Sequence, residues 1–175
     1  LLAFVSDKDL FGEFYRKKLS RRLLYVRSAS EDHERSILAR LKQQCGAQFT
    51  SKMEGMVNDL QLSKEGQSKF QEWVESNTRP PVDVSVTVLT TGYWPTYKTT
   101  ELNLPAEMLK SVEVYKEHYE AETSHRKLTW VYTLGNCIIR GHFNKKKIEM
   151  NLPTMQAACL LLFGGGEQID RKSVV

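Results

Sequence analysis

The sequence predicts an α+β protein in which a helical-bundle segment is followed by an α/β domain with an antiparallel sheet. Apolar residues recur every three or four positions over residues 1–76, which is the period of a helix, and alternate over residues 83–89, which is the period of a strand. Between them, the pair Pro80-Pro81 cannot continue a helix and marks a boundary. The expected parts are a helical segment at 1–79, an α+β domain at 80–163 and a flexible or atypical tail at 164–175.

Three amphipathic helices with short joints predict an antiparallel bundle in the helical segment. The first spans Asp7–Val26. A capping-box pattern of Ser28 and Glu31 precedes the second, and Gly46 is a natural stop for it. The third opens at residue 50 or 51 and extends to residue 76, with Gly66 as a candidate break or bend. Because the helical apolar face continues back to Leu1 and no cap stands at that end, we also expect an amino-terminal truncation.

The second part is predicted to contain a strand, a helix, three strands and a last helix. The expected elements are a strand at Asp83–Leu89, a helix that begins at Pro105, strands at Leu128–Leu134, Ile138–Phe143 and Ile148–Leu152, and a helix at Pro153–Phe163. Gly135-Asn136 is expected to form a two-residue hairpin turn between the second and third strands.

Two features of this part suggest surfaces for a partner. Four short strands leave two sheet edges, and each edge is either covered or offered to an incoming strand. The loop Gly92–Pro95 is either a turn whose rings cap the core or a partner-binding surface. Periodicity alone does not choose between these interpretations.

Positive charge is concentrated in the first predicted helix. The chain carries 25 Lys and Arg against 21 Asp and Glu, a net charge of +4, which is less than a dedicated nucleic-acid-binding protein usually carries. Tyr15–Arg27 holds several Lys and Arg and no acid. Three interpretations stay open: a solvated helix within a bundle, an electrostatic landing surface for an acidic partner, or a nucleic-acid-binding surface at residues 15–27.

The residues that usually carry catalysis do not converge in the sequence. The four histidines are scattered, and no Cys or His pair has the spacing typical of a zinc site. The triple glycine at 164–166 lacks the lysine and serine of a phosphate-binding loop. We therefore predict a non-catalytic protein with no cofactor and no metal site. The enzymatic alternative requires Cys45, Cys137 or Cys159 beside a histidine.

Composition favours a reducing compartment. Three cysteines are an odd number at wide spacings, which favours free thiols over a disulfide framework. The longest apolar run, residues 157–163, is far shorter than the roughly 20 residues that cross a bilayer, and no secretion leader is visible. We expect a cytoplasmic and nuclear protein that does not span a membrane.

Several ordered blocks of the sequence resemble the cullin family. The blocks are Ser6–Leu24, Ser28–Glu34, Leu41–Gly46, Thr50–Met56, Val88–Pro95, Leu104-Pro105, His125–Trp130 and Thr154–Ala158. The similarity covers residues 1 to about 163 and is closest to plant cullins of the first paralogue type. It implies a fragment from the carboxyl-terminal part of a cullin, whereas residues 164–175 are not similar to the family.

This resemblance implies a scaffold subunit of an SCF-type cullin-RING ubiquitin ligase, acting in ubiquitin-dependent protein degradation, rather than an enzyme. It implies that an extended strand of a RING-box protein completes the sheet, at Val84, Val86, Val88, Leu128, Trp130 and Tyr132. It also implies that Lys17, Arg21 and Arg22 attract the acidic tail of a ubiquitin-conjugating enzyme. Adaptor and F-box proteins would bind only through family regions that are missing from this sequence.

Overall fold

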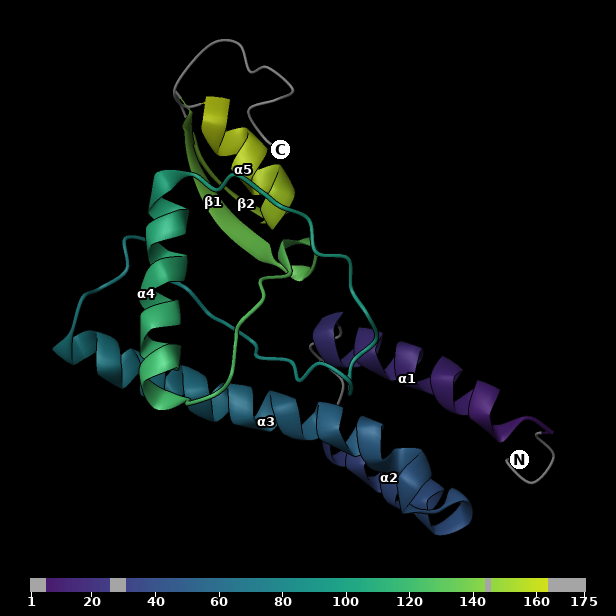
Figure 1. Ribbon diagram of the computed structural model, residues 1–175. Helices are drawn as coiled ribbons and strands as arrows, with labels where there is room; N and C mark the ends of the chain where they lie inside the picture. The colour runs from purple at the N-terminus through teal and green to yellow at the C-terminus, as the bar shows by residue number, and fades with distance from the viewer. Residues whose placement is uncertain (1–5, 26–30, 144–145, 164–175) are drawn as a thin grey trace. The chain divides into compact units, whose positions relative to one another are not determined.

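The computed structural model describes residues 6–25, 31–143 and 146–163 (Figure 1). Within these residues it contains five α-helices, one 3₁₀ helix and a two-stranded antiparallel sheet, which confirms the predicted α+β class. The elements are α1 (Lys8–Tyr25), α2 (Glu31–Cys45), α3 (Ala47–Ser76), α4 (Ala106–Glu122), η2 (Tyr132–Leu134), β1 (Asn136–Phe143), β2 (Lys146–Pro153) and α5 (Thr154–Leu162).

The chain forms two compact units. The first, called the helical unit here, comprises Leu1–Gln71 and Ser85–Thr96. The second, called the mixed unit, comprises Glu72–Val84 and Tyr97–Val175.

A capping side chain and the backbone conformation of a glycine determine where helices of the helical unit begin and end. The Leu10 N–H donates to Asp7 Oδ1 at 2.9 Å, so Asp7 caps the first turn of α1. Gly46 ends α2 with a φ of +88°, a conformation that glycine adopts without steric cost, and its N–H donates to the Lys42 carbonyl at 2.9 Å. α3 continues through Gly66 as one helix of 30 residues, so the candidate break is wrong. Ser28 of the predicted capping box lies outside the described residues.

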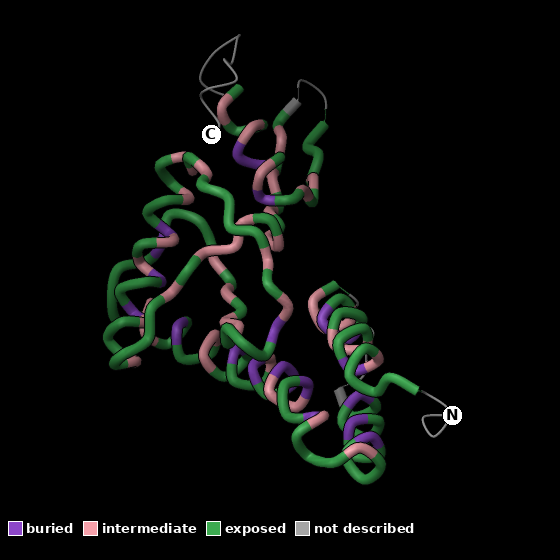
Figure 2. Tube along the Cα trace, turned by 45° about the vertical axis from the view of Figure 1, so that its right-hand side comes forward, coloured by how far each residue is buried: buried purple, intermediate pink, exposed green. Residues whose placement is uncertain are grey.

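The core of the helical unit consists of apolar side chains that recur along α1, α2 and α3 (Figure 2). The buried apolar residues of these helices are Leu19, Leu38, Leu41, Met53, Met56, Val57 and Phe70. Full burial of each such side chain contributes about 1.5–3 kcal/mol. At Gly12 the helices lie so close that an added Cβ would stand 2.8 Å from the Phe49 ring. Tertiary packing of this kind stabilises helices that would be marginal alone.

The mixed unit begins with aromatic packing on α4. α4 begins one residue after the predicted start, with Pro105 at its N-cap position, and Tyr115 and His118 are buried on one face. The Tyr115 ring meets Trp130 edge-on at 6.1 Å between centroids, and His118 lies 5.4 Å from Trp73. These contacts fix the carboxyl end of α3 and the segment before η2 against α4.

The hairpin of β1 and β2 and the helix α5 complete the mixed unit. β1 pairs antiparallel with β2, from Asn136 opposite Pro153 to Phe143 opposite Lys146, which confirms the last two predicted strands. α5 follows immediately, which confirms the last predicted helix, with Pro153 at its N-cap position. The Thr154 N–H donates to the Gly135 carbonyl at 2.9 Å, which ties the start of α5 to the residue before β1.

The first two predicted strands are wrong. In the part of the chain that the structure describes, β1 and β2 are the only strands, and neither 83–89 nor 128–134 joins a sheet. Main-chain groups within 86–90 bond to helix side chains instead, and Tyr132–Leu134 forms η2. Alternation of apolar and polar residues indicates that a segment has one packed side and one exposed side. An extended segment against a helix satisfies that pattern as well as a strand does.

The predicted Gly135-Asn136 hairpin turn is also wrong. The Gly135 N–H donates to the Tyr132 carbonyl at 3.2 Å, so this residue closes η2, and β1 begins at Asn136. An added Cβ at Gly135 would clash with Thr154 Oγ1. The glycine is therefore required for the close approach of α5 rather than for a turn.

Candidate functional site

A ladder of side-chain hydrogen bonds joins α3 to the extended segment, which we define as residues 86–90. The Val86 N–H donates to Gln67 Oε1 at 3.1 Å. The Val88 N–H donates to Ser63 Oγ at 2.9 Å, and that hydroxyl donates to the Val88 carbonyl at 3.2 Å. The Thr90 N–H donates to Asp59 Oδ2 at 2.7 Å. We call Asp59, Ser63 and Gln67 the polar ladder.

Helix and strand geometry explain why the ladder keeps its register. Its three residues are four positions apart on α3, which corresponds to a rise of about 6.0 Å per step. Its partners are two positions apart in the extended segment, about 6.6 Å per step. Because the two steps are nearly equal, three successive bonds form between a helix and a chain that runs in the opposite direction (Figure 1).

Asp59 accepts several hydrogen bonds from the extended segment and the loop after it. Besides the Thr90 amide, its carboxylate accepts the Thr90 hydroxyl at 2.9 Å and the Trp94 indole N–H at 2.7 Å. The residue is 7% exposed and Trp94 is 5% exposed. Three donors on one buried carboxylate compensate its loss of hydration. Asp59 thereby fixes both the end of the extended segment and the loop that follows.

The Gly92–Pro95 loop is a turn anchored on the helical unit. Gly92 has a φ of +103°, and the Tyr93 N–H donates to the Thr90 carbonyl at 3.1 Å. The Tyr93 ring lies against Gly55, where an added Cβ would stand 2.6 Å from it. Arg16 Nη1 donates to the Tyr93 carbonyl at 3.2 Å. With Trp94 buried, this placement agrees with a turn whose rings cap the core.

The ladder satisfies one edge of the extended segment and leaves the other edge open. In an extended chain the N–H and C=O of one residue point to the same side, and those of its neighbours point to the opposite side. The main-chain groups of Ser85, Thr87 and Leu89 therefore face away from α3. Among the described residues, none of these groups makes a hydrogen bond, and Ser85 and Thr87 are exposed.

The six residues predicted to contact a RING-box strand are divided between the two units. Val86 and Val88 belong to the helical unit, whereas Val84 belongs to the mixed unit with Leu128, Trp130 and Tyr132. All six are half-buried. Burial raises the pKa of Tyr132 above its ordinary value. The structure thus brings the two valines together on the segment whose open edge is described above.

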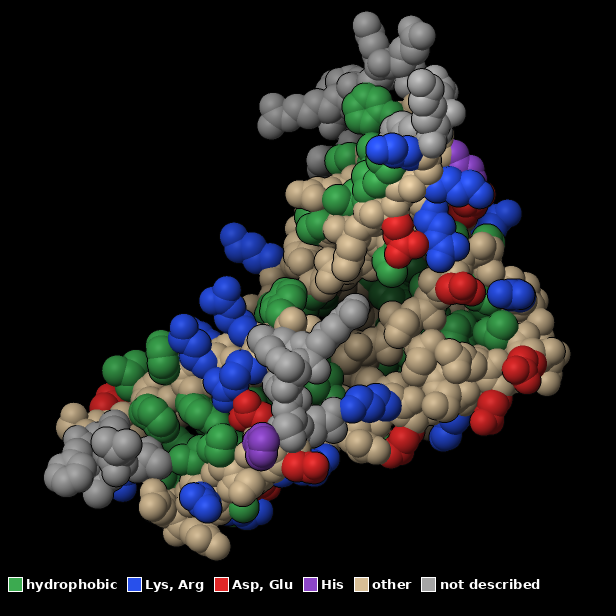
Figure 3. Space-filling view, turned by 180° about the vertical axis from the view of Figure 1, so that it is seen from behind, with side chains coloured by type: hydrophobic (Ala, Val, Ile, Leu, Met, Phe, Trp, Pro, Cys, Tyr) green, Lys and Arg blue, Asp and Glu red, His purple; other side chains and the backbone are tan. Residues whose placement is uncertain are grey.

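Two of the three predicted conjugating-enzyme contacts present unpaired charge. Lys17 and Arg21 lie four positions apart on α1, both are exposed, and neither forms an ion pair with another described residue. Figure 3 shows Lys and Arg side chains gathered over α1 beside hydrophobic ones. Neighbouring Lys18 lies over the Phe14 ring, 5.4 Å from its centroid, and Phe14 is 58% exposed.

Arg22, the third, is held in an ion pair. Its Nε donates to Glu34 Oε1 at 2.6 Å and its Nη2 donates to Glu34 Oε2 at 3.1 Å, which forms a bidentate ion pair between α1 and α2. The hydrogen bond to Glu34 raises the pKa of Arg22, and burial raises the pKa of the adjoining Tyr15. The charge of Arg22 is therefore paired with that of Glu34, and this contact joins α1 to α2.

The sequence interpretation missed the polar ladder and Glu34, although both leave a signal. Asp59, Ser63 and Gln67 occur at steps of four on the side of α3 that also carries Met56 and Phe70. Glu34 lies four positions before Leu38 on the buried side of α2. A polar residue inside an apolar stripe must find a hydrogen-bonding partner when the stripe is buried. Such interruptions therefore predict a polar contact, but they do not name its partner.

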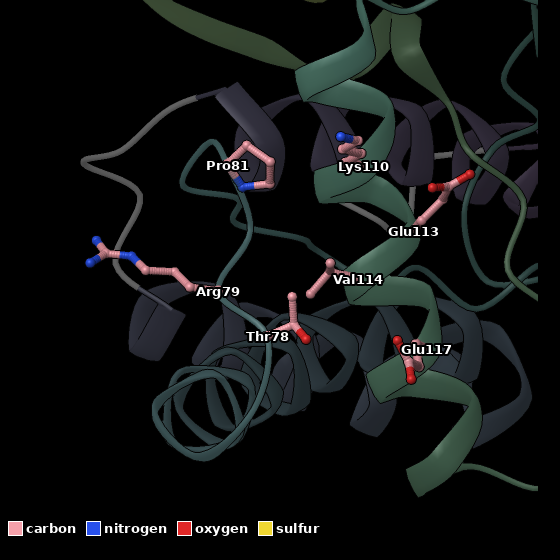
Figure 4. Close-up of a pocket in the computed structure, with 7 residues that line it drawn as sticks. All are labelled: Thr78, Arg79, Pro81, Lys110, Glu113, Val114 and Glu117. Atoms are coloured by element: carbon pink, nitrogen blue, oxygen red, sulfur yellow. The ribbon is translucent and has the colours of Figure 1, made fainter.

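A shallow pocket of about 300 Å³ lies in the mixed unit, between the chain after α3 and one side of α4 (Figure 4). Its lining residues are Thr78, Arg79, Pro81, Lys110, Glu113, Val114 and Glu117. Thr78 and Val114 point toward one another, whereas the Arg79 side chain extends away from α4. The lining contains no cysteine or histidine, so the nucleophile and base required by the enzymatic alternative do not meet in this pocket.

The described residues contain neither a metal-binding cluster nor a helix that could cross a membrane. No group of three or more His, Cys, Asp or Glu side chains in 6–25, 31–143 and 146–163 is arranged to hold a metal ion. Within the same ranges, no helix has the length and apolar character needed to cross a membrane. Cys45, Cys137 and Cys159 are free thiols and each is half-buried.

Comparison with known proteins identifies two family domains in the chain. A model described as the cullin alpha solenoid domain matches residues 1–67, and one described as the cullin alpha+beta domain matches residues 88–174. The second match includes most of residues 164–175, so the similarity to the family extends beyond residue 163, where it was expected to end.

Curated relatives align along all or nearly all of the chain. Cullin-1 of Oryza sativa subsp. japonica is 57% identical and Cullin-2 of Arabidopsis thaliana is 51% identical, each over 100% of this chain and 24% of the relative. Cullin-4A of Homo sapiens is 43% identical over 95% of this chain and 22% of its own length. The chain thus spans about a quarter of the length of the relatives it matches.

Proposed function

Because the chain belongs to the cullin family, we propose that it forms part of the non-catalytic scaffold of a cullin-RING ubiquitin ligase of the SCF type. In this role it acts in ubiquitin-dependent protein degradation by holding a RING-box protein and by attracting a ubiquitin-conjugating enzyme. The observation that carries the proposal is the extended segment, whose one edge is bonded to α3 while its other edge is open. An open main-chain edge is what a partner strand needs for β-augmentation.

Retention of a RING-box protein tests the central part of the proposal. The full chain, co-expressed with a plant RING-box protein, is expected to retain it through affinity purification and gel filtration. A chain that shows the expected helical circular dichroism and still fails to retain the RING-box protein would contradict this function.

A proline at the open edge makes the test specific. Thr87→Pro removes the main-chain donor of Thr87 and leaves the three bonds of the polar ladder, which use the amides of Val86, Val88 and Thr90. Proline also favours an extended conformation at the preceding residue, so the segment keeps its shape. We expect Thr87→Pro to weaken RING-box binding about fivefold or more, because one main-chain hydrogen bond of about 1 kcal/mol is lost, as measured by calorimetry. Thr87→Ala, which keeps the N–H, is the matched control and should bind like the unaltered chain.

Steering of the conjugating enzyme belongs to Lys17 and Arg21 in this proposal. Exposed charges of one sign raise the rate of encounter with an acidic tail more than they raise affinity. Reversal of both residues to Glu should therefore slow capture of the enzyme in stopped-flow measurements, with a smaller effect as salt rises. Arg40→Glu with Lys52→Glu gives the same change in net charge at two exposed positions outside α1. Equal slowing by both pairs would assign the effect to net charge rather than to α1.

Binding of adaptor or F-box proteins is not part of the function proposed for this chain, and no residue is assigned to it. No observation favours nucleic-acid binding at residues 15–27, so that alternative is not proposed. Localisation in the cytoplasm and nucleus is part of the same proposal, and imaging of a fluorescent fusion of the full chain in plant cells tests it.

A further inference from the structure

We infer that Asp59, Ser63 and Gln67 are positioning residues for strand addition: they hold the extended segment in its binding conformation before a partner arrives. The inference relies on the proposed function for the identity of the partner, a RING-box strand. It adds two statements to that function. It assigns the pairing edge to Ser85, Thr87 and Leu89, and it assigns the preparation of that edge to side chains of α3.

The bonding pattern supports the first statement. The polar ladder takes the amides of Val86, Val88 and Thr90, which in a sheet would be bonded to a neighbouring strand. α3 therefore replaces a strand on that side and blocks it for any other partner. An incoming strand can pair only with the opposite side, where the main chain of Ser85, Thr87 and Leu89 has no hydrogen bond among the described residues.

Conformational entropy supports the second statement. Fixing the backbone of one residue costs about 1–2 kcal/mol, and a loose segment would incur that cost when its partner binds. A segment that is already extended incurs it during folding, so more of the interaction free energy appears as affinity. Buried Asp59 and Ser63 anchor two of the three contacts in the core of the helical unit, which makes the ladder a rigid support.

Amide hydrogen exchange of the chain alone tests the ladder without any partner. Val86, Val88 and Thr90 should exchange slowly, and Ser85, Thr87 and Leu89 should exchange at least about fivefold faster, which corresponds to a hydrogen bond of about 1 kcal/mol. Addition of the RING-box protein should slow Ser85, Thr87 and Leu89 and leave the other three unchanged. Uniform exchange along 85–90 in the chain alone would overturn the ladder.

Substitution of Ser63 then links the ladder to binding. Ser63→Ala removes the hydroxyl that both accepts from and donates to Val88. We expect faster exchange of the Val88 amide and RING-box affinity lowered about fivefold or more, with rescue by Ser63→Thr. Ser68→Ala is the matched control, because the Ser68 hydroxyl bonds only to the Lys64 carbonyl of its own helix. If Ser63→Ala does not fold, Gln67→Ala removes the acceptor of the Val86 amide at a less buried position.

The outcomes separate this inference from the proposed function. Loss of Val88 protection with unchanged affinity for the RING-box protein would overturn the positioning role and leave the proposed function standing. No binding by the unaltered chain, combined with alternating exchange, would reject the RING-box partner and leave the ladder established as a structural support. Lower affinity of Ser63→Ala, restored by Ser63→Thr, supports both.

Discussion

The two segments that were predicted as the first strands share a sequence pattern and are held by different interactions. The extended segment (residues 86–90), which overlaps the strand predicted at 83–89, is held in the helical unit by main-chain bonds to polar side chains of α3. Residues 128–134 in the mixed unit are held by the edge-on contact of Trp130 with Tyr115, by a Thr133 hydroxyl bond to the Lys98 carbonyl at 3.3 Å, and by η2. Aromatic packing fixes the positions of side chains, whereas the polar ladder fixes the positions of the main-chain amides.

This difference matters for partner recognition. A segment whose alternate amides are fixed on one side presents the remaining amides in register on the other side, which is the requirement for strand addition. A segment held by ring contacts and a 3₁₀ turn has no such regular edge. We therefore expect residues 86–90 to supply the first main-chain pairing with a partner strand.

The largest expected effect is that of Asp59→Ala. The substitution leaves the Thr90 amide and the buried Trp94 indole N–H without their acceptor. Unsatisfied buried donors cost about 1–3 kcal/mol each, so the free energy of unfolding should fall by about 3–5 kcal/mol. Urea denaturation followed by circular dichroism measures this. Glu149→Ala is the matched control in the hairpin, because its ion pair with Arg140 is exposed and should contribute less than about 1 kcal/mol. Equal losses would show that the ladder does not stabilise the helical unit.

An intermediate effect is expected at Gly55, which supports the loop after the extended segment. In Gly55→Ala the new Cβ would stand 2.6 Å from the Tyr93 ring, so the loop must move away from α3. Overpacking of this kind costs about 1–3 kcal/mol. Gly66→Ala, on the same helix with open space around the added atom, should instead raise stability by about 0.5–1 kcal/mol. Thermal unfolding of the two variants compares them, and destabilisation by both would contradict the stated contact.

Helices and the last hairpin could be predicted from the sequence because their signals are local. Periodic apolar residues, Gly46 after α2 and the prolines before α4 and α5 each act within one or two turns of the chain. The β1–β2 pair is also local, since its strands are adjacent in the sequence. The α+β class follows from these elements alone.

The contacts of the candidate site could not be predicted because they join distant residues. Thr90 lies 31 positions from Asp59, and Arg22 lies 12 positions from Glu34. Sequence identifies each as polar or charged, but not the partner that neutralises it. The family resemblance and the charge pattern therefore group Arg22 with Lys17 and Arg21, although only the latter two present unpaired charge among the described residues. Alternation likewise identified extended segments without stating what lies beside them.

The smallest expected effect is a loss of stability at alkaline pH. It should arise at residues 128–134, which are packed against a tyrosine, and not at residues 86–90, which are held by the polar ladder. Burial raises the pKa of Tyr115, the ring that holds Trp130, to about 12, with smaller contributions from Tyr119 and Glu122. The ordinary value in the unfolded chain is 10.0. Because the folded-state pKa is the higher one, the stabilising contribution of neutral Tyr115 is complete below about pH 10 and is lost as pH rises through about 12.

Tyr115→Phe removes this titration and keeps the ring. The free energy of unfolding of the unaltered chain should therefore fall relative to that of Tyr115→Phe between about pH 10 and pH 12, by up to roughly 2 kcal/mol. Urea denaturation of both proteins at matched pH measures the difference, which cancels the titration of lysines common to both. The polar ladder contains no tyrosine, so a Ser63→Ala protein should lose stability across this range in parallel with the unaltered chain. A constant difference between the unaltered chain and Tyr115→Phe would mean that aromatic packing at Trp130 does not depend on a neutral Tyr115.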